Sequence, residues 1–470
     1  MRLSYHVDRS TRTILAVAAL VGSVTRSSAQ ARTIPAAASI ARMAPAIDSI
    51  TETFRQEYSF PGITIAVATT AGDVIYENGY GFADRATRRA ATSRTPFRIY
   101  SISKVFAAVV THQLVEAGQL SLSAPIGRYL TDLPAWRDTV VVRQLIAHTS
   151  GIEDYTDMPG YEASASAGRS EDNHFVALAL QRPLLFPSGS QWRYSNTGYA
   201  LLQRIMERVT GDAFPATLSK RVLAPADLAA TSPECRLDRI ATGYTAAWRL
   251  GLPGDSVVAS QNRNAHRYNV AAGGLCSTAP DVARFMARLV GGRIVNSASL
   301  ADMIARIPVD SRSGAGLFVQ EDSEGLILRH SGGGGNGNAE AMAFPRDSLV
   351  LVALTNSGGA DFERLIRDLR RQILGLPQPV VLDLPMTRDE WAPLLGTYVN
   401  ATSGERVAVV VDRAGQPFAF GGRLLKQADG SYVSQGYRDW RLTFRRSSGG
   451  TVELTITAFG VVIQRGQRRP

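Results

Sequence analysis

Lysine is nearly absent from this chain of 470 residues. Only Lys104, Lys220 and Lys426 are lysines among the 51 basic residues, and arginine supplies the rest. Because arginine cannot release its proton in proteins, a retained lysine is a candidate for a position that needs a titratable amine. The arginines are scattered, and no zinc-finger, RNP or homeodomain pattern occurs. The formal net charge of +10 therefore does not indicate a nucleic-acid partner.

Two common hydrolase signatures are also missing. The chain has no G-x-S-x-G elbow, which argues against an α/β-hydrolase, and no H-E-x-x-H zinc motif. Its six histidines are dispersed, so a metallohydrolase is not expected either. We expect no metal and no other cofactor. Stoichiometric zinc in the purified protein would revive the metallohydrolase hypothesis.

Long apolar runs are missing as well. The best candidate, at 14–24, is well short of the roughly 20 residues that span a membrane. It follows a basic segment that begins at Arg2, and it precedes an A-x-A site that ends at Ala31. This pattern is typical of a secretory signal peptide over residues 1–31. We expect cleavage after Ala31, a periplasmic or secreted mature protein, and no stable membrane span.

Cysteine is scarce, with Cys235 and Cys276 the two examples. In an oxidising compartment they could pair. A disulfide requires Cα atoms within about 7 Å, and the sequence does not fix that distance. The bond stays an open question at this point.

The order of predicted elements divides the rest of the chain into four parts. Residues 32–45 are rich in Ala and Pro and predict a linker, while 46–375 mix strands and helices. A Pro-rich linker is expected over 376–390. Short alternating strands with Gly and Asp turns predict an all-β domain over 391–470, either a small barrel or a sandwich.

Within the large central part, strands lie at both ends and helices lie between them. A hairpin is predicted over 62–84, strands return over 317–355, and an amphipathic helix follows at 361–374. Strands from both ends would join in one sheet. We therefore predict an α+β fold, in which an antiparallel sheet is flanked by helices and a helical lobe packs beside it. The functional site is expected in the cleft between the two lobes.

A Ser-x-x-Lys motif stands where an extended segment runs into an apolar helical pattern. Positions i and i+3 share a helix face, so Ser101 and Lys104 project the same way. A serine hydroxyl needs a neighbouring base to become a nucleophile, and a partly buried amine can be that base. The motif alone is weak, because a helix start with an unrelated surface lysine reads identically.

A second pattern, Tyr194-Ser195-Asn196, lies in a predicted loop before a helix. It could be an ordinary helix cap. Its chemical interpretation is a phenol near Lys104, where the ammonium would lower the phenol pKa so that a phenolate takes the Ser101 proton. Asn196 would then hydrogen-bond the substrate amide or Lys104.

A third pattern, His330-Ser331-Gly332, ends a predicted strand and runs into further glycines. No Gly-Lys-Ser/Thr follows, so a phosphate cradle is not favoured. An edge strand that a substrate backbone can approach is the alternative. The N–H groups of Gly333 and Ser101 could then form an oxyanion hole. A lone strand histidine is more often structural than catalytic.

Together the three patterns are far more specific, and the chain resembles the serine β-lactamase and penicillin-binding-protein superfamily. With Tyr-x-Asn in the second motif it is most similar to the class C β-lactamase branch, which includes DD-peptidases and esterases. The similarity covers about residues 46–375, and the segments 145–151, 194–202 and 272–275 also resemble the superfamily. It implies a β-lactamase/transpeptidase-like fold.

The resemblance also implies roles for the motif residues. Ser101 would be the acylated nucleophile, and Lys104 and Tyr194 the base pair. His148 belongs to a familiar stretch and is interpreted as structural. The expected substrate-binding residues are Asn196, His330, Ser331, Gly332 and Gly333.

One departure from the class C pattern matters. His330 stands where those β-lactamases usually carry a lysine, which removes a permanent positive charge that would hold a substrate carboxylate. A protonated histidine could replace that charge in part. We therefore expect esters and D-peptides to be better substrates than nitrocefin. The C-terminal part resembles the lipocalin-like barrel that some superfamily members carry. In those proteins it contributes to assembly or shapes the cleft, so the resemblance implies a possible homo-oligomer.

Two functions are compatible with these observations. The first is an exported serine hydrolase that forms an acyl-enzyme on Ser101 with a D-amino-acid peptide, an ester or a β-lactam. The second is a non-catalytic envelope or peptidoglycan-binding protein on the same scaffold. Labelling of Ser101 by a fluorescent penicillin or a fluorophosphonate separates the two, as does ester turnover that Lys104→Ala abolishes.

Overall fold

The computed structural model describes most of the chain after residue 36. The described residues are 37–166, 172–236, 238–246, 257–259, 269–310, 312–322, 324–359, 362–377, 380–400, 406–412, 414–420, 422–435, 437–446, 450–458 and 461–468. The predicted signal peptide lies outside them.

The central part of the chain has strands at its two ends, and most helices of the described residues lie between these two groups of strands in the sequence. The helices are α1 (Ala37–Glu57), α2 (Ser103–Glu116), α3 (Val142–Ile146), α4 (Tyr161–Ser166), α5 (Asp172–Leu180), α6 (Asn196–Thr210), α7 (Phe214–Leu218), α8 (Val270–Gly273), α9 (Ala279–Val290), α10 (Ser297–Ile304), α11 (Phe362–Leu374) and α12 (Arg388–Trp391). In this part of the chain, no helix has both the length and the apolar character that crossing a membrane requires.

The strands form two large assemblies and two small ones. Those of the central part are β1 (Gly62–Thr69), β2 (Val74–Asp84), β3 (Arg89–Ala90), β4 (Phe97–Arg98), β5 (Tyr244–Ala246), β6 (Val257–Ala259), β7 (Cys276–Ser277), β8 (Phe318–Asp322), β9 (Gly325–Gly334), β10 (Gly337–Phe344) and β11 (Leu349–Thr355). Those of the C-terminal part are β12 (Gly396–Val399), β13 (Arg406–Val411), β14 (Pro417–Ala419), β15 (Gly422–Lys426), β16 (Tyr432–Ser434), β17 (Tyr437–Arg446), β18 (Val452–Ala458) and β19 (Val461–Arg468).

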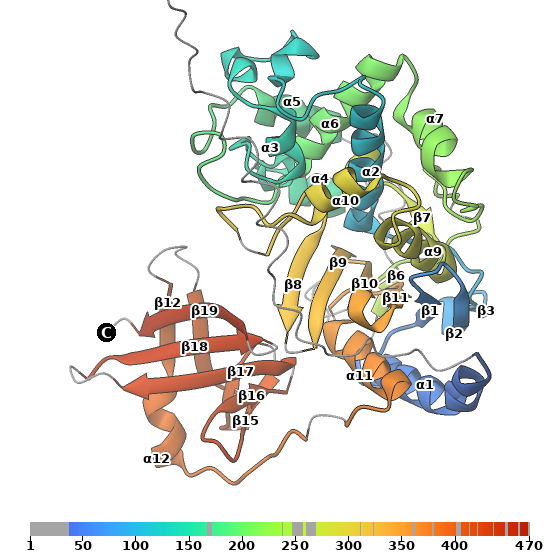
Figure 1. The fold of residues 1–470 in the computed structure, drawn as a ribbon. Coiled ribbons are helices and arrows are strands. Elements are labelled where there is room, and N and C mark those ends of the chain that lie inside the picture. The colour runs from blue at the N-terminus through green and yellow to red at the C-terminus, as the bar shows by residue number, and fades with distance from the viewer. Residues whose placement is uncertain are drawn as a thin grey trace, which may run out of the picture.

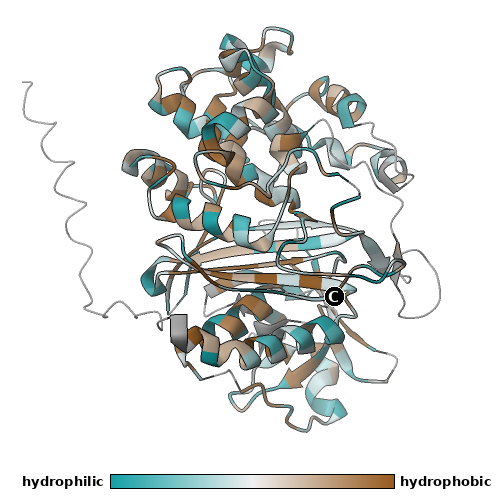
Figure 2. Cartoon of the chain, turned by 90° about the vertical axis from the view of Figure 1, so that its right-hand side faces the viewer, coloured by the Kyte–Doolittle hydropathy of each residue, from teal (hydrophilic) through white to brown (hydrophobic). Residues whose placement is uncertain are grey.

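The main sheet joins strands from both ends of the central part, as predicted. Its order is β3-β2-β1-β11-β10-β9-β8, and every neighbouring pair is antiparallel. Helix α9 packs on one face, and α1 and α11 pack on the other. The helical lobe lies beyond α9, so the sheet is a middle layer (Figures 1 and 2). The predicted α+β fold with a flanked antiparallel sheet and a helical lobe is confirmed.

Both faces of this sheet are buried, and β1 shows how one strand serves both. Its Ile63, Ile65 and Val67 join the core under α1 and α11. Its Ala66 and Ala68 join the larger core that contains α2 and α9. Successive side chains of a strand point to opposite faces, so large residues fill one core and small residues admit helices closely on the other.

The N-terminal linker was predicted too long. Helix α1 begins at Ala37 and continues through Pro45, so much of the segment 32–45 is helical. Alanine has the highest helix propensity, and Ile40 and Ile47 are fully buried two turns apart. The stability gained from that buried stripe outweighs the helix-breaking tendency of Pro45.

The C-terminal part is a closed barrel whose strands follow one another in sequence, from β12 round to β19 (Figure 1). On β13, Val407 and Val409 point inward while Ala408 and Val410 are exposed, the alternation that a barrel wall requires. Tyr398 packs edge-on against another aromatic ring inside. Of the two forms left open, the barrel is the one found. Strand β15 and helix α12 were not predicted.

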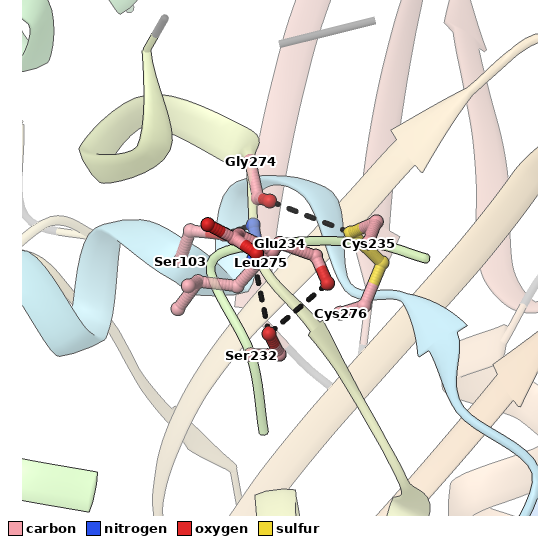
Figure 3. The surroundings of a disulfide bond; sticks show 7 residues. All are labelled: Ser103, Ser232, Glu234, Cys235, Gly274, Leu275 and Cys276. Atoms are coloured by element: carbon pink, nitrogen blue, oxygen red, sulfur yellow. Dashed lines mark hydrogen bonds between the residues drawn. A yellow bond between two sulfur atoms is a disulfide. The ribbon is translucent and has the colours of Figure 1, made fainter. Parts of the chain in front are cut away.

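The two cysteines form a disulfide close to the start of α2. Cys235 and Cys276 have Cα atoms 5.5 Å apart. Cys276 lies in β7 and pairs with Arg98 of β4, the strand that leads into the Ser-x-x-Lys motif. Next to it, the Leu275 N–H donates to Ser103 Oγ of α2 at 3.2 Å (Figure 3). The bond therefore anchors the segment against which the motif folds.

Loss of this disulfide is expected to lower the free energy of unfolding by about 2–4 kcal/mol. The bond links residues 41 positions apart, and it restricts the unfolded chain accordingly. Urea unfolding of Cys235→Ser/Cys276→Ser against the wild type measures the difference. A reductant should lower the wild-type midpoint to that of the double variant and leave the variant unchanged. Equal midpoints in all samples would contradict the assignment.

Candidate active site

Ser101 lies in η1 (Tyr100–Ile102), a single 3₁₀ turn between β4 and α2. Tyr100, immediately before it, has a φ of 46°. This left-handed conformation is uncommon for a residue other than glycine, and such conformations are often found at functional sites. Burial of the Tyr100 side chain and a hydrogen bond hold this backbone conformation, because the Tyr100 hydroxyl donates to Asn336 Oδ1 at 2.8 Å. The turn that carries Ser101 is therefore rigidly placed.

The glycines of β9 make room for this turn. A Cβ at Gly332 would collide with the Ile99 carbonyl oxygen, and one at Gly334 would lie 2.8 Å from Cε1 of Tyr100. A Cβ at Gly337, on β10, would lie 2.6 Å from the Tyr100 hydroxyl. From the sequence, the space left by the missing side chains was expected to admit an approaching substrate. At Gly332 and Gly334 the space is instead filled by Ile99 and Tyr100, the residues that lead into Ser101.

Gly332→Ala is expected to lower kcat roughly 100-fold. The new Cβ would meet backbone atoms that cannot rotate away, so the Ser101 turn or β9 must shift. Steady-state turnover, with a Tm to monitor folding, is the measurement. Gly335→Ala is the matched control, because a Cβ there meets nothing within 4 Å. If both variants kept wild-type kcat, the close approach would have no part in catalysis.

Lys104 is fully buried at the first turn of α2. Its Nζ lies 3.1 Å from Ser101 Oγ, 2.7 Å from Asn196 Oδ1 and 2.5 Å from the Ala272 carbonyl oxygen. A neutral amine has two N–H groups and one lone pair. The two carbonyl-type oxygens can accept only from the N–H groups, so the lone pair is left for the hydroxyl hydrogen of Ser101.

Burial also favours the neutral amine. Desolvation lowers the pKa of Lys104 to about 7, and the nearby Asp154 carboxylate opposes that shift only in part. The Nζ lies 4.8 Å from the centre of the Tyr194 ring and 5.4 Å from that of Tyr199. A base with a pKa near the working pH has the balance of availability and strength that proton transfer needs.

Tyr194 is the third member of the cluster, with its ring facing Lys104 Nζ and its side chain close enough to Ser101 to affect the phenol pKa. Desolvation by burial raises the pKa of Tyr194 far above its ordinary value, and the Asp154 charge adds to the rise. The phenolate predicted from the sequence is therefore wrong on electrostatic grounds. A neutral phenol at Tyr194 can donate a proton or relay one, which leaves the Lys104 amine as the candidate base.

His148 supports Tyr194 from behind, in agreement with its interpretation as structural. The two rings stack with centroids 4.4 Å apart. The Nδ1 atom of His148 accepts from the Ser195 N–H at 3.1 Å. Burial, reinforced by the Lys104 charge, holds the pKa of His148 well below its ordinary value. A neutral imidazole therefore fixes the loop that delivers Tyr194.

His330 is buried on β9, with Nδ1 2.6 Å from the Ser331 carbonyl oxygen. Burial, together with the charge of Lys104, lowers its pKa to about 3. The suggestion that a protonated histidine replaces the class C lysine charge is therefore wrong, because His330 is neutral near pH 7. Its ring instead lies 5.2 Å from that of Phe318, as part of an uncharged wall.

The end of β9 offers a free backbone edge beside the site. β10 pairs with β9 as far as Gly334, whereas β8 pairs with it only as far as Arg329. In the described part of the chain, no strand covers that side of His330–Gly334. Ser331 is half-buried and Gly333 is exposed there. The predicted edge strand is thus present, and an extended substrate can pair with it.

Two further groups contribute to the site but were not predicted from the sequence. Asp154, in the loop before η4 (Tyr155–Asp157), contacts Asn196, and the Ala272 carbonyl accepts from Lys104. Neither has a spacing signal: one is an acid in a loop, and the other is a backbone atom. The segment around Ala272 stood out only through its resemblance to the superfamily.

The family model described as Beta-lactamase matches residues 47–375. Among curated relatives, penicillin-binding protein 4 of Amycolatopsis lactamdurans is 30% identical over 379 residues, which cover 74% of this chain and 95% of that protein. The matched region holds Ser101, Lys104, Tyr194 and His330.

Two solved structures resemble the fold. The octameric penicillin-binding protein homologue from Pyrococcus abyssi has a TM-score of 0.64 at 22% identity, and covers 91% of this chain and 100% of its own. The D-amino acid amidase of Ochrobactrum anthropi SV3, complexed with L-phenylalanine amide, has a TM-score of 0.60 at 26% identity, and covers 71% of this chain and 97% of its own. The chain therefore belongs to the beta-lactamase family of serine hydrolases, together with penicillin-binding proteins.

Proposed function

We propose that this protein hydrolyses amides and esters of D-amino acids through an acyl-enzyme on Ser101. The observation that carries the proposal is the pairing of the Ser101 hydroxyl with a buried amine whose N–H groups are already engaged. The same geometry argues against a purely binding protein, because a binding cleft does not require a lysine held near neutrality. The relative that acts on D-amino acid amides supports the substrate class.

The acylation step follows from these positions. Ser101 Oγ forms a bond to the substrate carbonyl carbon while its proton passes to Lys104 Nζ. The negative oxygen of the tetrahedral intermediate accepts from the N–H groups of Ser101 and Gly333. The C–N or C–O bond then breaks, and the leaving group takes a proton through the Tyr194 hydroxyl, which returns Lys104 to its neutral form. In deacylation, a water molecule attacks the acyl-enzyme while the same groups act in the reverse direction, and the acid product is released.

A neutral His330 separates this substrate class from β-lactams. Without a charge at that position, the wall beside β9 supplies no cation for the carboxylate that a penicillin carries. Amides and esters without a free carboxylate lose nothing there. This argument supports a preference for D-amino acid amides and esters over nitrocefin. The preference for D-peptides over nitrocefin rests on the resemblance of the sequence alone and is kept as part of the proposal.

Export is a further part of the proposal. The predicted signal peptide over residues 1–31 supports a periplasmic or secreted location, and the Cys235–Cys276 bond is of the kind that persists in oxidising compartments. The barrel remains a candidate for assembly, and light scattering on the mature protein would give its oligomeric state.

The experiment that tests the function is a substrate panel. D-alanine amide, a D-Ala-D-Ala peptide, p-nitrophenyl acetate and nitrocefin are compared by kcat/KM, with L-alanine amide as the stereochemical control. We expect turnover of the D-amide and the ester, and a lower value for nitrocefin. If nitrocefin were the best substrate, the D-amide assignment would be wrong. If no member of the panel were turned over and none labelled Ser101, the assignment of the protein as a hydrolase would itself be wrong.

A further inference from the structure

A buried carboxylate lies immediately behind the proposed active site. Asp154 is 4% exposed and comes from the loop that leads into η4. Neither the proposed acylation nor the superfamily motifs use it. A buried acid is costly unless donors satisfy it, so its contacts indicate what holds it there.

Four donors converge on this carboxylate. Its Oδ2 accepts from the backbone N–H of Asn196 at 2.6 Å and from Asn196 Nδ2 at 3.0 Å. Its Oδ1 accepts from the N–H and the hydroxyl of Thr156, both at 2.8 Å. Because all four partners donate, the group is placed as an acceptor on both oxygens.

These contacts decide which end of the Asn196 amide faces Lys104. An amide whose Nδ2 donates to Asp154 must turn its Oδ1 the other way, and that Oδ1 lies 2.7 Å from Lys104 Nζ. We propose that Asp154 is a positioning residue, which acts through Asn196 to aim the Lys104 lone pair at Ser101 and to balance the charge of the lysine. The inference rests on the acyl-enzyme function proposed above.

The groups that face Lys104 are consistent with this role. His148 and His330 approach it from two other elements, and the Lys104 charge lowers the pKa of both. Tyr194 presents a ring face. Asp154 is the carboxylate whose charge raises the Lys104 pKa against the desolvation that lowers it. Asp154 therefore keeps the amine basic enough to take a proton in a pocket that otherwise disfavours one.

Asp154→Asn is the first test. An amide at this position offers both a donor and an acceptor to a ring of donors, so Asn196 is no longer held in one orientation. We expect kcat to fall roughly 10-fold. In the wild type, kcat/KM should rise with pH as Lys104 loses its proton, and this rise is the acid limb of the pH profile. In the variant the acid limb should move to lower pH by roughly one unit, because no carboxylate stabilises the ammonium form of Lys104.

The exchanged pair Asp154→Asn/Asn196→Asp is the second test, and it covers the case in which the single variant fails to fold. The exchange restores a donor–acceptor pair between the two positions and puts the carboxylate directly beside Lys104 Nζ. The acid limb should then move above that of the wild type. A merely structural role would lower Tm in the single variant and leave its acid limb unmoved, which would overturn the inference. If the single variant does not fold, an acid limb of the exchanged variant that stayed at the wild-type position would overturn it.

A readout without turnover separates this inference from the proposed function. NMR of protein labelled with ¹³C at lysine Cε follows the protonation of Lys104 directly in both variants. Asp157→Asn is the matched control, because Asp157 lies at the end of η4, the turn that Asp154 begins, in an exposed ion pair with Arg193. If the wild type never labelled Ser101 but the Lys104 titration moved as expected, the function would fail and the positioning role would stand. An unmoved titration would refute the positioning role alone.

Discussion

Ser101→Ala is expected to reduce hydrolysis of every substrate roughly 10⁴-fold or more and to abolish covalent labelling by fluorophosphonates. The variant removes the one atom to which the acyl group would be attached under the proposed mechanism, and alanine fits the space. The turn should persist, because it is held by the Tyr100 hydroxyl and by the glycines of β9 rather than by the serine. Folding is therefore expected to be unchanged, and the loss to lie in kcat.

Labelling followed by intact-mass measurement checks this prediction, with steady-state kinetics beside it. Ser123→Ala is the control, because that serine is exposed and lies outside the cluster. A variant at Ser101 that still gained the mass of the probe would place the nucleophile elsewhere. Equal turnover in the two variants would have the same consequence.

Lys104→Met is expected to have the second largest effect, a loss of about 10²–10⁴-fold in kcat/KM. Methionine keeps the length and apolar stem of the side chain, so the fully buried site stays filled without a charge. What disappears is the lone pair that takes the Ser101 proton. Lys220→Met is the matched control, because Lys220 is exposed and paired with Asp212.

The pH dependence of the wild type follows from the same amine. Only the neutral form of Lys104 can accept a proton, and its pKa is lowered to about 7. Activity should therefore rise as the pH rises through about 7 and reach a plateau above that point. In Lys104→Met this limb should vanish. An acid limb that persisted unchanged in the variant would assign it to another group.

The architecture could be predicted from the sequence because its signals are local or periodic. Alternation of large and small residues located β1, a continuous apolar run marks β11, and a helical stripe located α11. The motif spacing then brought Ser101 and Lys104 onto one turn. Pro45 misled the prediction of α1, because the burial that stabilises that helix comes from residues far away in sequence.

The electrostatics of the site could not be predicted in the same way. The sequence placed an ammonium beside Tyr194 and so suggested a phenolate, but burial raises the phenol pKa and lowers that of the lysine. Burial is a property of the packed lobes and has no signature in a motif. Asp154 was missed for the related reason that its contact with Asn196 exists only once the loop before η4 meets the start of α6.

The most direct test of the account is the protonation of Lys104 in the wild-type protein. The chain has only three lysines, so ¹³Cε labelling gives a spectrum simple enough to assign with Lys104→Met. The resonance missing from that variant should titrate near pH 7, as a buried base requires. A midpoint near 10.4, the ordinary value for a lysine, would show that the amine stays charged at working pH and would contradict its role as the base for Ser101.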